Sequence, residues 1–258
     1  MKNKTNYASA FLMITVSWAG LVSVAQADWS IGLRADNDSQ ESYRNKKHKY
    51  SVAILHPKYR GDKFNIDNGT ASYDFTNSNN FAVEAILKQN HYGFESSDGS
   101  TFKGMKKRKQ SIDVGARGIL DTGLVGPAVV EITRDFHASK GYEANAKIGG
   151  ITPHAPHWTG ERKVQIAAMG GLRYQSAKTV DYYYGVKSSE ATANRKQYKA
   201  KSALTPYIGV EGQVNLTPHI SFDGGLTLSK RANSIRKSPL SNNKKYDYGV
   251  NVGFSYWF

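Results

Sequence analysis

Cysteine is absent from this 258-residue chain, and several kinds of chemistry are excluded with it. Without a thiol the chain can form no disulfide, use no cysteine nucleophile, bind no metal through thiolates and carry no lipid on an N-terminal cysteine. Long apolar runs are also absent after residue 27, since no later segment approaches the roughly 20 apolar residues of a membrane-spanning helix. Proline is scarce at 7 residues, while 24 glycines and 16 tyrosines favour a sheet protein with aromatic girdles.

The first 27 residues predict a cleaved signal peptide. Lys2 and Lys4 form a positive start, residues 11–24 are apolar and almost uncharged, and residues 25–27 read AQA, a small-x-small cleavage site. We therefore expect cleavage after Ala27, which leaves a signal peptide, 1–27, and one mature domain, 28–258. A permanent helical anchor is the weaker interpretation, because the apolar stretch is too short to span a membrane.

The last fourteen residues, KYDYGVNVGFSYWF, alternate between two kinds of side chain. One face of the predicted strand is apolar or aromatic, and the other is small or polar apart from Trp257, which is the lipid-out, lumen-in pattern of an outer-membrane barrel strand. The spacing of Asn251, Gly253, Tyr256 and Phe258 also resembles the C-terminal signal that the outer-membrane assembly machinery recognises in its clients. The competing interpretation is a buried edge strand of a soluble sandwich.

The same alternation recurs in seven further segments, which are 28–36, 110–120, 124–134, 142–150, 163–173, 204–214 and 220–229. Their connections alternate between short and long, as a barrel with tight periplasmic turns and larger outer loops requires. Region 49–90 could hold four strands or two long bent ones. We predict an all-β fold, a single transmembrane antiparallel up-and-down β-barrel of about 12 strands, with 10 as the alternative, in the outer membrane.

Acidic residues are fewer than basic ones, and the excess lysines and arginines are concentrated in the predicted outer loops. Removing residues 1–27 takes away only Lys2 and Lys4, which lowers the formal charge from +14 to +12. Loops 37–48, 91–109 and 231–244 are rich in lysine and arginine, which predicts contact with lipopolysaccharide phosphates, and a dedicated polyanion or host-surface site is the alternative. Nucleic acid is not an expected partner, because few aromatic residues accompany these lysines.

Charged residues of both signs also occupy the predicted lumen face. They are Arg34, Asp36, Asp113, Arg117, Glu131, Glu143, Lys147, Lys163, Arg173, Glu211, Asp223 and Asp247. In a narrow barrel such groups can pair and close the lumen to all but small solutes, so a plug network is favoured over a selective pore.

Catalysis is not predicted, and neither a metal nor another cofactor is expected. His154 and His157 lie in the segment ITPHAPHW, where the prolines disfavour the helix that would bring both rings to one face. Asp135, His137 and Ser139 have the composition of a hydrolase triad within one outer loop, but a triad is defined by geometry rather than by composition.

Residues 181–186 read DYYYGV and are followed by Glu190, Arg195 and Tyr198. In this form the segment resembles the signature of the MipA/OmpV family of outer-membrane proteins, and residues 111–115 and 238–240 are weaker matches. The residues that we assign to this signature loop are Tyr182, Tyr183, Tyr184, Gly185, Val186, Arg195 and Tyr198. We expect residues 182–186 to cap the barrel mouth by packing rings over the lumen, with Arg195 and Tyr198 as partners.

The resemblance implies a non-enzymatic scaffold of the cell envelope. Members are described as MltA-interacting proteins that link a lytic murein transglycosylase to a peptidoglycan synthase, and other members are tied to osmotic response, adhesion or drug susceptibility. The resemblance implies no catalytic residues. A small-solute pore and an adhesin-like surface protein are the alternatives, and a barrel hydrolase is less favoured.

Overall fold

The computed structural model describes residues 28–37, 43–46, 50–54, 56–76, 78, 80–123, 125–153 and 160–258. The predicted signal peptide, 1–27, lies outside the described residues, as do His48, His154 and His157. No helix in the described part of the chain is long and apolar enough to cross a membrane.

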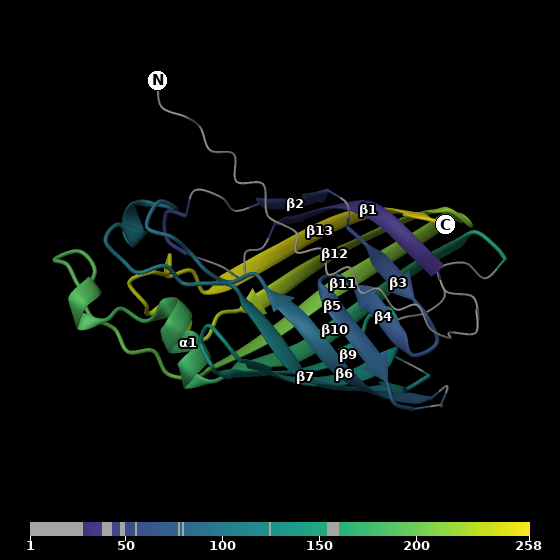
Figure 1. Cartoon of the computed structure of the whole chain (residues 1–258), viewed down its shortest axis with the longest axis horizontal. Helices are drawn as coiled ribbons and strands as arrows, with labels where there is room; N and C mark the ends of the chain where they lie inside the picture. The colour runs from purple at the N-terminus through teal and green to yellow at the C-terminus, as the bar shows by residue number, and fades with distance from the viewer. Residues whose placement is uncertain are drawn as a thin grey trace, which may run out of the picture.

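The described residues form one antiparallel sheet that closes on itself (Figure 1). Its strands are β1 (Asp28–Asn37), β2 (Tyr50–Ile54), β3 (Lys58–Arg60), β4 (Phe64–Asp67), β5 (Thr70–Asp74), β6 (Phe81–Asn90), β7 (Ser111–Asp121), β8 (Pro127–Asp135), β9 (Tyr142–Gly149), β10 (Lys163–Gln175), β11 (Ala203–Thr217), β12 (Ile220–Lys230) and β13 (Tyr246–Trp257). The last strand returns to the first, pairing from Ser30 with Trp257 to Asn37 with Val250. Because β2 and β3 both pair with β1, they occupy one position in the wall, and the predicted barrel of 12 strands is confirmed.

The alternation predicted from the sequence sets the two faces of the wall. Outward side chains are apolar and exposed, for example Val130 at 55% and Ile166 at 76%, whereas serines, asparagines and charged groups point inward. An apolar band that surrounds the whole molecule would be unfavourable in water, at about 25 cal/mol for each Å² exposed. The outer wall therefore requires a lipid environment, and the alternative of a soluble sandwich is wrong.

The two ends of the barrel differ, and we call them the turn end and the loop end. The turn end holds the start of β1 and the end of β13, where the Phe258 N–H donates to the Trp29 carbonyl at 2.9 Å (Figure 1). The loop end carries the long connections and the helices α1 (Ala177–Tyr184) and α2 (Asn233–Arg236), together with the short helical turns η1 (Ser100–Phe102) and η2 (Ser188–Glu190).

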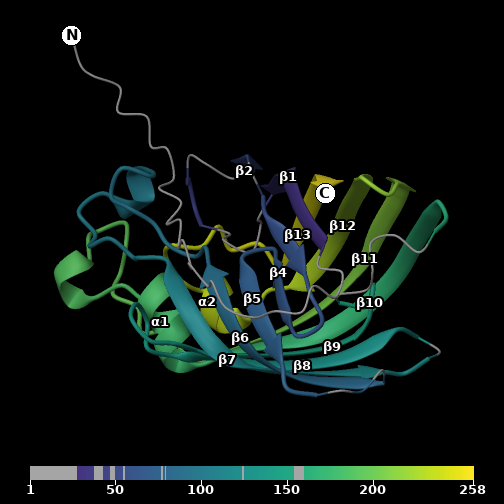
Figure 2. The same ribbon diagram turned by 45° about the vertical axis from the view of Figure 1, so that its right-hand side comes forward.

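Region 49–90 supplies four wall positions, which confirms the first of the two alternatives. A two-residue turn, Asn68-Gly69, joins β4 to β5, and φ is positive at both residues, at 50° and 71°, as such a hairpin requires. This turn points toward the loop end, where the Gln89 N–H donates to the Gly69 carbonyl at 2.9 Å (Figure 2). It is therefore an exception to the predicted rule that every short connection lies at the turn end.

Ion pairs line the lumen, as predicted, although they join nearby strands rather than opposite walls. The Asp223 carboxylate binds Arg34 at 2.9 Å and Lys58 at 2.8 Å, and Glu84 binds Arg117 at 2.6 Å. Further pairs link Lys88 to Glu131 at 2.7 Å and Lys147 to Glu211 at 3.4 Å. Pairing neutralises charges that would otherwise be costly in a narrow interior, so these bridges fill the lumen with fixed polar groups.

Closure of the barrel depends on a glycine beside the seam. A Cβ atom at Gly32 would lie 2.0 Å from the carbonyl oxygen of Phe254, which belongs to the closing strand β13. We expect Gly32→Val to destabilise the barrel by about 1–3 kcal/mol or more, because the obstructing atom is backbone and cannot turn away. The measurement is the temperature at which the compact, fast-migrating form is lost in unboiled gel electrophoresis.

The matched control is Gly118→Val in β7. A Cβ atom at Gly118 would have no heavy atom within 4 Å, so this glycine, which also lies within a strand, can be replaced by valine without a steric clash. An equal loss of the compact form in both variants would contradict the role given to Gly32.

Candidate functional site

Helix α1 lies across the loop end and is positioned by its first and last residues (Figures 1 and 2). The Ser176 hydroxyl caps its N-terminus by accepting from the Thr179 N–H at 3.4 Å, and it also accepts from the Tyr142 N–H at 2.9 Å. The helix buries Thr179, Val180, Tyr183 and Tyr184, a spacing that places these side chains on one face toward the barrel.

Aromatic residues from separate connections pack beneath α1 and form what we call the cap. Its buried members are Tyr43, Phe94, Phe102, Met105, Val180, Tyr183, Tyr184, Val186, Ala200, Ala203, Ile235 and Leu240. Ring centroids lie 5.1 Å apart for Tyr43 and Tyr184 and 4.4 Å apart for Phe94 and Phe102, which are stacked. The cap is thus a second, water-excluding core above the polar lumen, and four of the long connections contribute to it.

Three carbonyl groups at the end of α1 bind side chains of three other connections. The Tyr182 carbonyl accepts from Arg108 Nε at 2.7 Å, and the Tyr183 carbonyl accepts from the Tyr43 hydroxyl at 3.2 Å. The Tyr184 carbonyl accepts from the Ser238 hydroxyl at 2.6 Å. The last carbonyl groups of a helix have no hydrogen-bond donor within the helix. Because these three are buried, they need donors from elsewhere, and the three side chains supply them.

Glu190 is the charged centre of the cap. Its carboxylate accepts two bonds from Arg108, at 3.0 Å and 2.7 Å, and one each from the Lys106 and Lys187 N–H groups, at 3.1 Å and 3.2 Å. Burial alone would raise the pKa of Glu190, but the Arg108 guanidinium and the two N–H groups lower it to about 2. The carboxylate therefore remains ionised, and it holds η2 against the connection between β6 and β7.

Arg195 makes a second link between the same two segments. Its guanidinium donates to the Glu190 carbonyl at 2.6 Å and 3.0 Å, and to the carbonyls of Thr101 at 2.6 Å and Lys103 at 3.2 Å. A planar donor fork fits this set of acceptors, which a lysine could not satisfy together.

The structure brings the predicted signature loop together, with one difference in how its parts interact. Tyr183, Tyr184 and Val186 are buried in the cap, and Val186 pairs with Tyr198 through two backbone bonds of 2.8 Å and 3.0 Å. A Cβ atom at Gly185 would lie 2.3 Å from the Asp181 carbonyl. Tyr182 and Tyr198 pack against the cap, as expected, and the Tyr198 hydroxyl donates to the Ser234 carbonyl. The hydrogen bonds of Arg195 go to backbone carbonyls of neighbouring segments and not to the tyrosines.

Sequence reasoning missed most of the residues that complete the cap. Tyr43, Phe94 and Phe102 lie in loops that were notable only for their charge, and Arg108 was counted as a surface base although it is buried. The α1 helix was also unforeseen inside a connection of this length. Ser176 followed by an apolar face at helical spacing is the signal that could have indicated it.

The residues of the predicted assembly signal occupy both faces of β13. Tyr256 and Phe258 are exposed on the outer wall, where their rings lie 5.4 Å apart, and Tyr256 also stacks on His219 at 5.7 Å. Asn251 and Gly253 lie on the lumen face. This placement leaves both rings accessible at the turn end, and recognition by the assembly machinery stays a prediction.

The Asp135, His137 and Ser139 group has the geometry of a turn rather than of a triad. The Asp135 carboxylate accepts from the His137 and Ala138 N–H groups at 2.8 Å and 2.9 Å and from the Ser139 hydroxyl at 2.7 Å. The exposed His137 ring makes no hydrogen bond with any described residue. Likewise, no group of three or more His, Asp or Glu side chains in the described ranges could hold a metal ion.

Comparison with known proteins assigns the chain to a family. The model of the MltA-interacting protein MipA family matches residues 35–258, which is most of the chain. The chain belongs to the MipA family. It is similar to outer membrane protein OmpV of Vibrio cholerae, with 28% identity over 160 residues, and this match covers 61% of the chain but only 59% of OmpV.

Other similarities agree on the location. Outer membrane protein Omp26La of Vibrio anguillarum is 28% identical over 191 residues, which is 73% of this chain and 71% of that protein. A bacterial polysaccharide outer membrane secretin of known structure aligns over 90% of this chain and 98% of its own, with 10% identity and a TM-score of 0.42. The names of the relatives and the apolar outer wall together identify this MipA-family member as an outer-membrane β-barrel.

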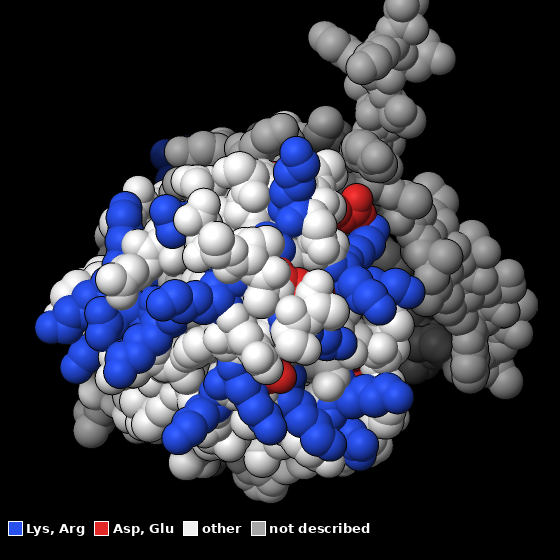
Figure 3. All heavy atoms as spheres, turned by 90° about the vertical axis from the view of Figure 1, so that its left-hand side faces the viewer, with Lys and Arg blue, Asp and Glu red and all other residues white. Residues whose placement is uncertain are grey.

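Membership of an outer-membrane family orients the molecule. Short turns of such barrels face the periplasm and long loops face the outside, so the cap covers the outer mouth. The outer surface is strongly basic (Figure 3). Four acidic residues occur in the described loops of the outer end, and each is already bonded: Glu95 to Lys107, Asp98 to the Glu95 N–H, Asp181 to the Ala200 N–H and Glu190 to Arg108.

Not every base predicted for the outer surface lies on it. Arg231 is buried, and its guanidinium binds Asp247, the Ser241 hydroxyl at 2.8 Å and the Asn242 amide oxygen at 2.7 Å. Arg108 is buried against Glu190. These two arginines hold the cap together, and the exposed lysines around them provide the external charge.

Glu190→Gln should loosen the cap while the barrel stays folded. Removing one partner of a buried ion pair costs about 3–5 kcal/mol, because the other charge is left unpaired. The near-ultraviolet circular dichroism of the packed tyrosines should melt at a lower temperature, whereas the far-ultraviolet signal of the strands should hold. Glu95→Gln is the matched control, since its exposed pair with Lys107 contributes at most about 1 kcal/mol.

The lowered pKa of Glu190 predicts how the stability of the cap changes with pH. Since the pKa of Glu190 falls from 4.5 to about 2 on folding, its contribution is present above pH 4.5 and is lost as the pH falls toward 2. This part of the pH dependence of cap melting should disappear in Glu190→Gln. An unchanged acid profile in that variant would contradict the role of Glu190.

Proposed function

We propose that this protein is a non-enzymatic scaffold of the cell envelope, which holds a periplasmic partner at the periplasmic mouth of its barrel. The partner that the family name supports is a lytic murein transglycosylase. The peptidoglycan synthase that the resemblance implied would join it in the same complex. The observation that carries the proposal is the difference between the two ends, since the outer mouth is capped and the periplasmic mouth opens into an acidic recess.

The recess is a cavity of about 690 Å³ at the turn end. Its lining includes the carboxylates of Asp28, Asp62, Asp74 and Asp121, together with the buried Glu84, which is already paired with Arg117 at 2.6 Å. Arg60 is the one lysine or arginine among the lining residues. An acidic concave surface on a chain with a formal charge of +14 is a local inversion of charge, and it favours a partner that presents basic side chains.

The recess also explains how short periplasmic turns could support a scaffold. The barrel needs no long periplasmic loops to bind a partner if a convex basic segment of that partner enters the mouth of the barrel. Two lining residues belong to the packed wall, since Pro127 is buried and the buried Glu84 is held by Arg117, so the floor of the recess is rigid. A preformed site loses little conformational freedom on binding.

The capped outer end argues against transport as the main activity. A solute would have to displace the packed rings of the cap and then pass the ion pairs of Arg34 and Asp223 and of Arg117 and Glu84. Reconstituted in planar bilayers, the protein should show no stepwise single-channel conductance. Discrete channel openings would contradict the scaffold proposal and support the small-solute pore.

Charge reversal in the recess is the direct test of binding. We expect Asp62→Lys with Asp121→Lys to weaken capture of a murein transglycosylase by about tenfold or more, because like charges would then face each other. The control is Glu95→Lys with Asp98→Lys, an equal change of charge at the outer end. Capture would be measured with the purified barrel in detergent against periplasmic extract, and equal capture by both variants would contradict the proposal.

A further inference from the structure

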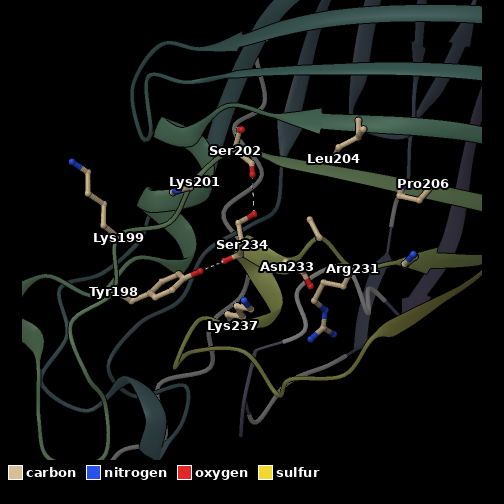
Figure 4. Close-up of a pocket in the computed structure, with 12 residues that line it drawn as sticks. Tyr198, Lys199, Lys201, Ser202, Leu204, Pro206, Arg231, Asn233, Ser234 and Lys237 are labelled. Atoms are coloured by element: carbon tan, nitrogen blue, oxygen red, sulfur yellow. Dashed lines mark hydrogen bonds between the residues drawn. The ribbon is translucent and has the colours of Figure 1, made fainter.

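A groove lies on the outside of the barrel, where the lipid-facing wall meets the cap (Figure 4). It has a volume of about 670 Å³ and runs between residues 198–206 on one side and the end of β12 with α2 on the other. It is separate from the periplasmic recess, and nothing in the scaffold proposal depends on it.

Four lysines line the groove; three lie beyond the ends of β11 and β12 at the loop end, and Lys230 is the last residue of β12, one step beyond the Ser229–Tyr207 pair. Lys199 and Lys201 belong to one side of the groove, and Lys230 and Lys237 belong to the other. None of these four ammonium groups has an acidic partner within 4.0 Å in the described part of the chain. Arg231 also lines the groove, but its guanidinium is already bound to Asp247. Four uncompensated positive charges around one hollow predict an anionic ligand with more than one charge.

The apolar side of the groove is continuous with the membrane-facing wall. Leu204, which is 56% exposed, and Pro206 lie on the outward face of β11. The next outward residue of that strand, Ile208, pairs directly with Leu228 of β12, and both are exposed. An alkyl chain that started at the lysines could therefore follow this wall into the hydrocarbon region.

Two hydrogen bonds hold the sides of the groove in place. The Tyr198 hydroxyl donates to the Ser234 carbonyl at 2.7 Å, and the Ser234 hydroxyl donates to the Ser202 carbonyl at 2.9 Å (Figure 4). Both bonds cross from the connection before β11 to helix α2. The groove is thus formed before any ligand arrives, which lowers the entropic cost of binding.

We infer that this groove binds the phosphorylated headgroup of an outer-leaflet glycolipid, the lipid A part of lipopolysaccharide. The phosphates lie among Lys199, Lys201 and Lys237, with Lys230 beside Pro206 at the edge of the wall, and the acyl chains run down past Leu204, Ile208 and Leu228. The assignment follows from position as well as charge, because the lysines lie at the level where the outward apolar face of the strands ends. A soluble polyanion has no apolar part that would contact the apolar side of the groove.

The test compares two triple variants of the mature barrel that lose the same charge. Lys199→Gln, Lys201→Gln and Lys237→Gln remove bases of the groove, whereas Lys103→Gln, Lys106→Gln and Lys140→Gln remove exposed bases elsewhere on the outer end. Binding of purified bisphosphorylated lipid A would be measured by native mass spectrometry in detergent. We expect the groove variant to bind about tenfold more weakly or worse, and the control to match the unmodified protein.

Three further measurements separate the lipid from other anions. Monophosphorylated lipid A should bind more weakly than the bisphosphorylated form, and inorganic phosphate at the same concentration should not displace either lipid. Leu204→Ser should weaken lipid binding while leaving all of the lysines in place. If the triple variant of the groove does not fold to the compact form seen on unboiled gels, lipid binding by the single variant Lys201→Gln is compared with binding by Lys106→Gln instead. Equal binding by the two triples, or displacement by inorganic phosphate, would overturn the inference.

Discussion

The unpaired carbonyl groups at the end of α1 are the constraint on which the outer half of this protein depends. A helix that ends inside a packed aromatic core cannot leave those groups without donors. The donors come from Arg108, Tyr43 and Ser238, which belong to three different connections. One short helix therefore fixes the positions of four loops at once. The buried pair of Arg108 and Glu190 follows from the same arrangement, because Arg108 serves both the helix and the carboxylate.

Fixing the loops in this way gives the barrel two unlike ends. At the outer end the acidic side chains of the described loops are all bonded, so the exposed charge is that of the lysines (Figure 3). At the periplasmic end the carboxylates of Asp28, Asp62, Asp74 and Asp121 line a recess. Between them, bridges such as Arg34 with Asp223 fill the lumen with fixed polar groups. A barrel built like this presents two differently charged surfaces joined by a lumen of fixed polar groups.

The wall was largely predictable, and the cap was not. Period-two alternation identified eight strands with their lipid and lumen faces, since each outward residue must meet hydrocarbon whatever its neighbours are. Between residues 49 and 90 the pattern was ambiguous, because β2 to β5 are only three to five residues long and the turn at Asn68-Gly69 reverses the chain within the wall. The tyrosines of residues 182–184 were predicted to pack over the mouth. Their hydrogen-bonding partners were not.

The sequence by itself determined the barrel, its two faces and the family resemblance, because alternation and the signature loop are local patterns that survive without knowledge of contacts. The choice between 10 and 12 strands needed the structure. Tertiary structure alone decided which charges are free. Arg108 and Lys106 are two residues apart in a basic run, yet the first is buried against Glu190, 82 residues away, and the second is exposed. Tyr43 reaches α1 across 140 residues. Such pairings depend on how the closed barrel brings distant loops over one mouth, and no local pattern encodes that.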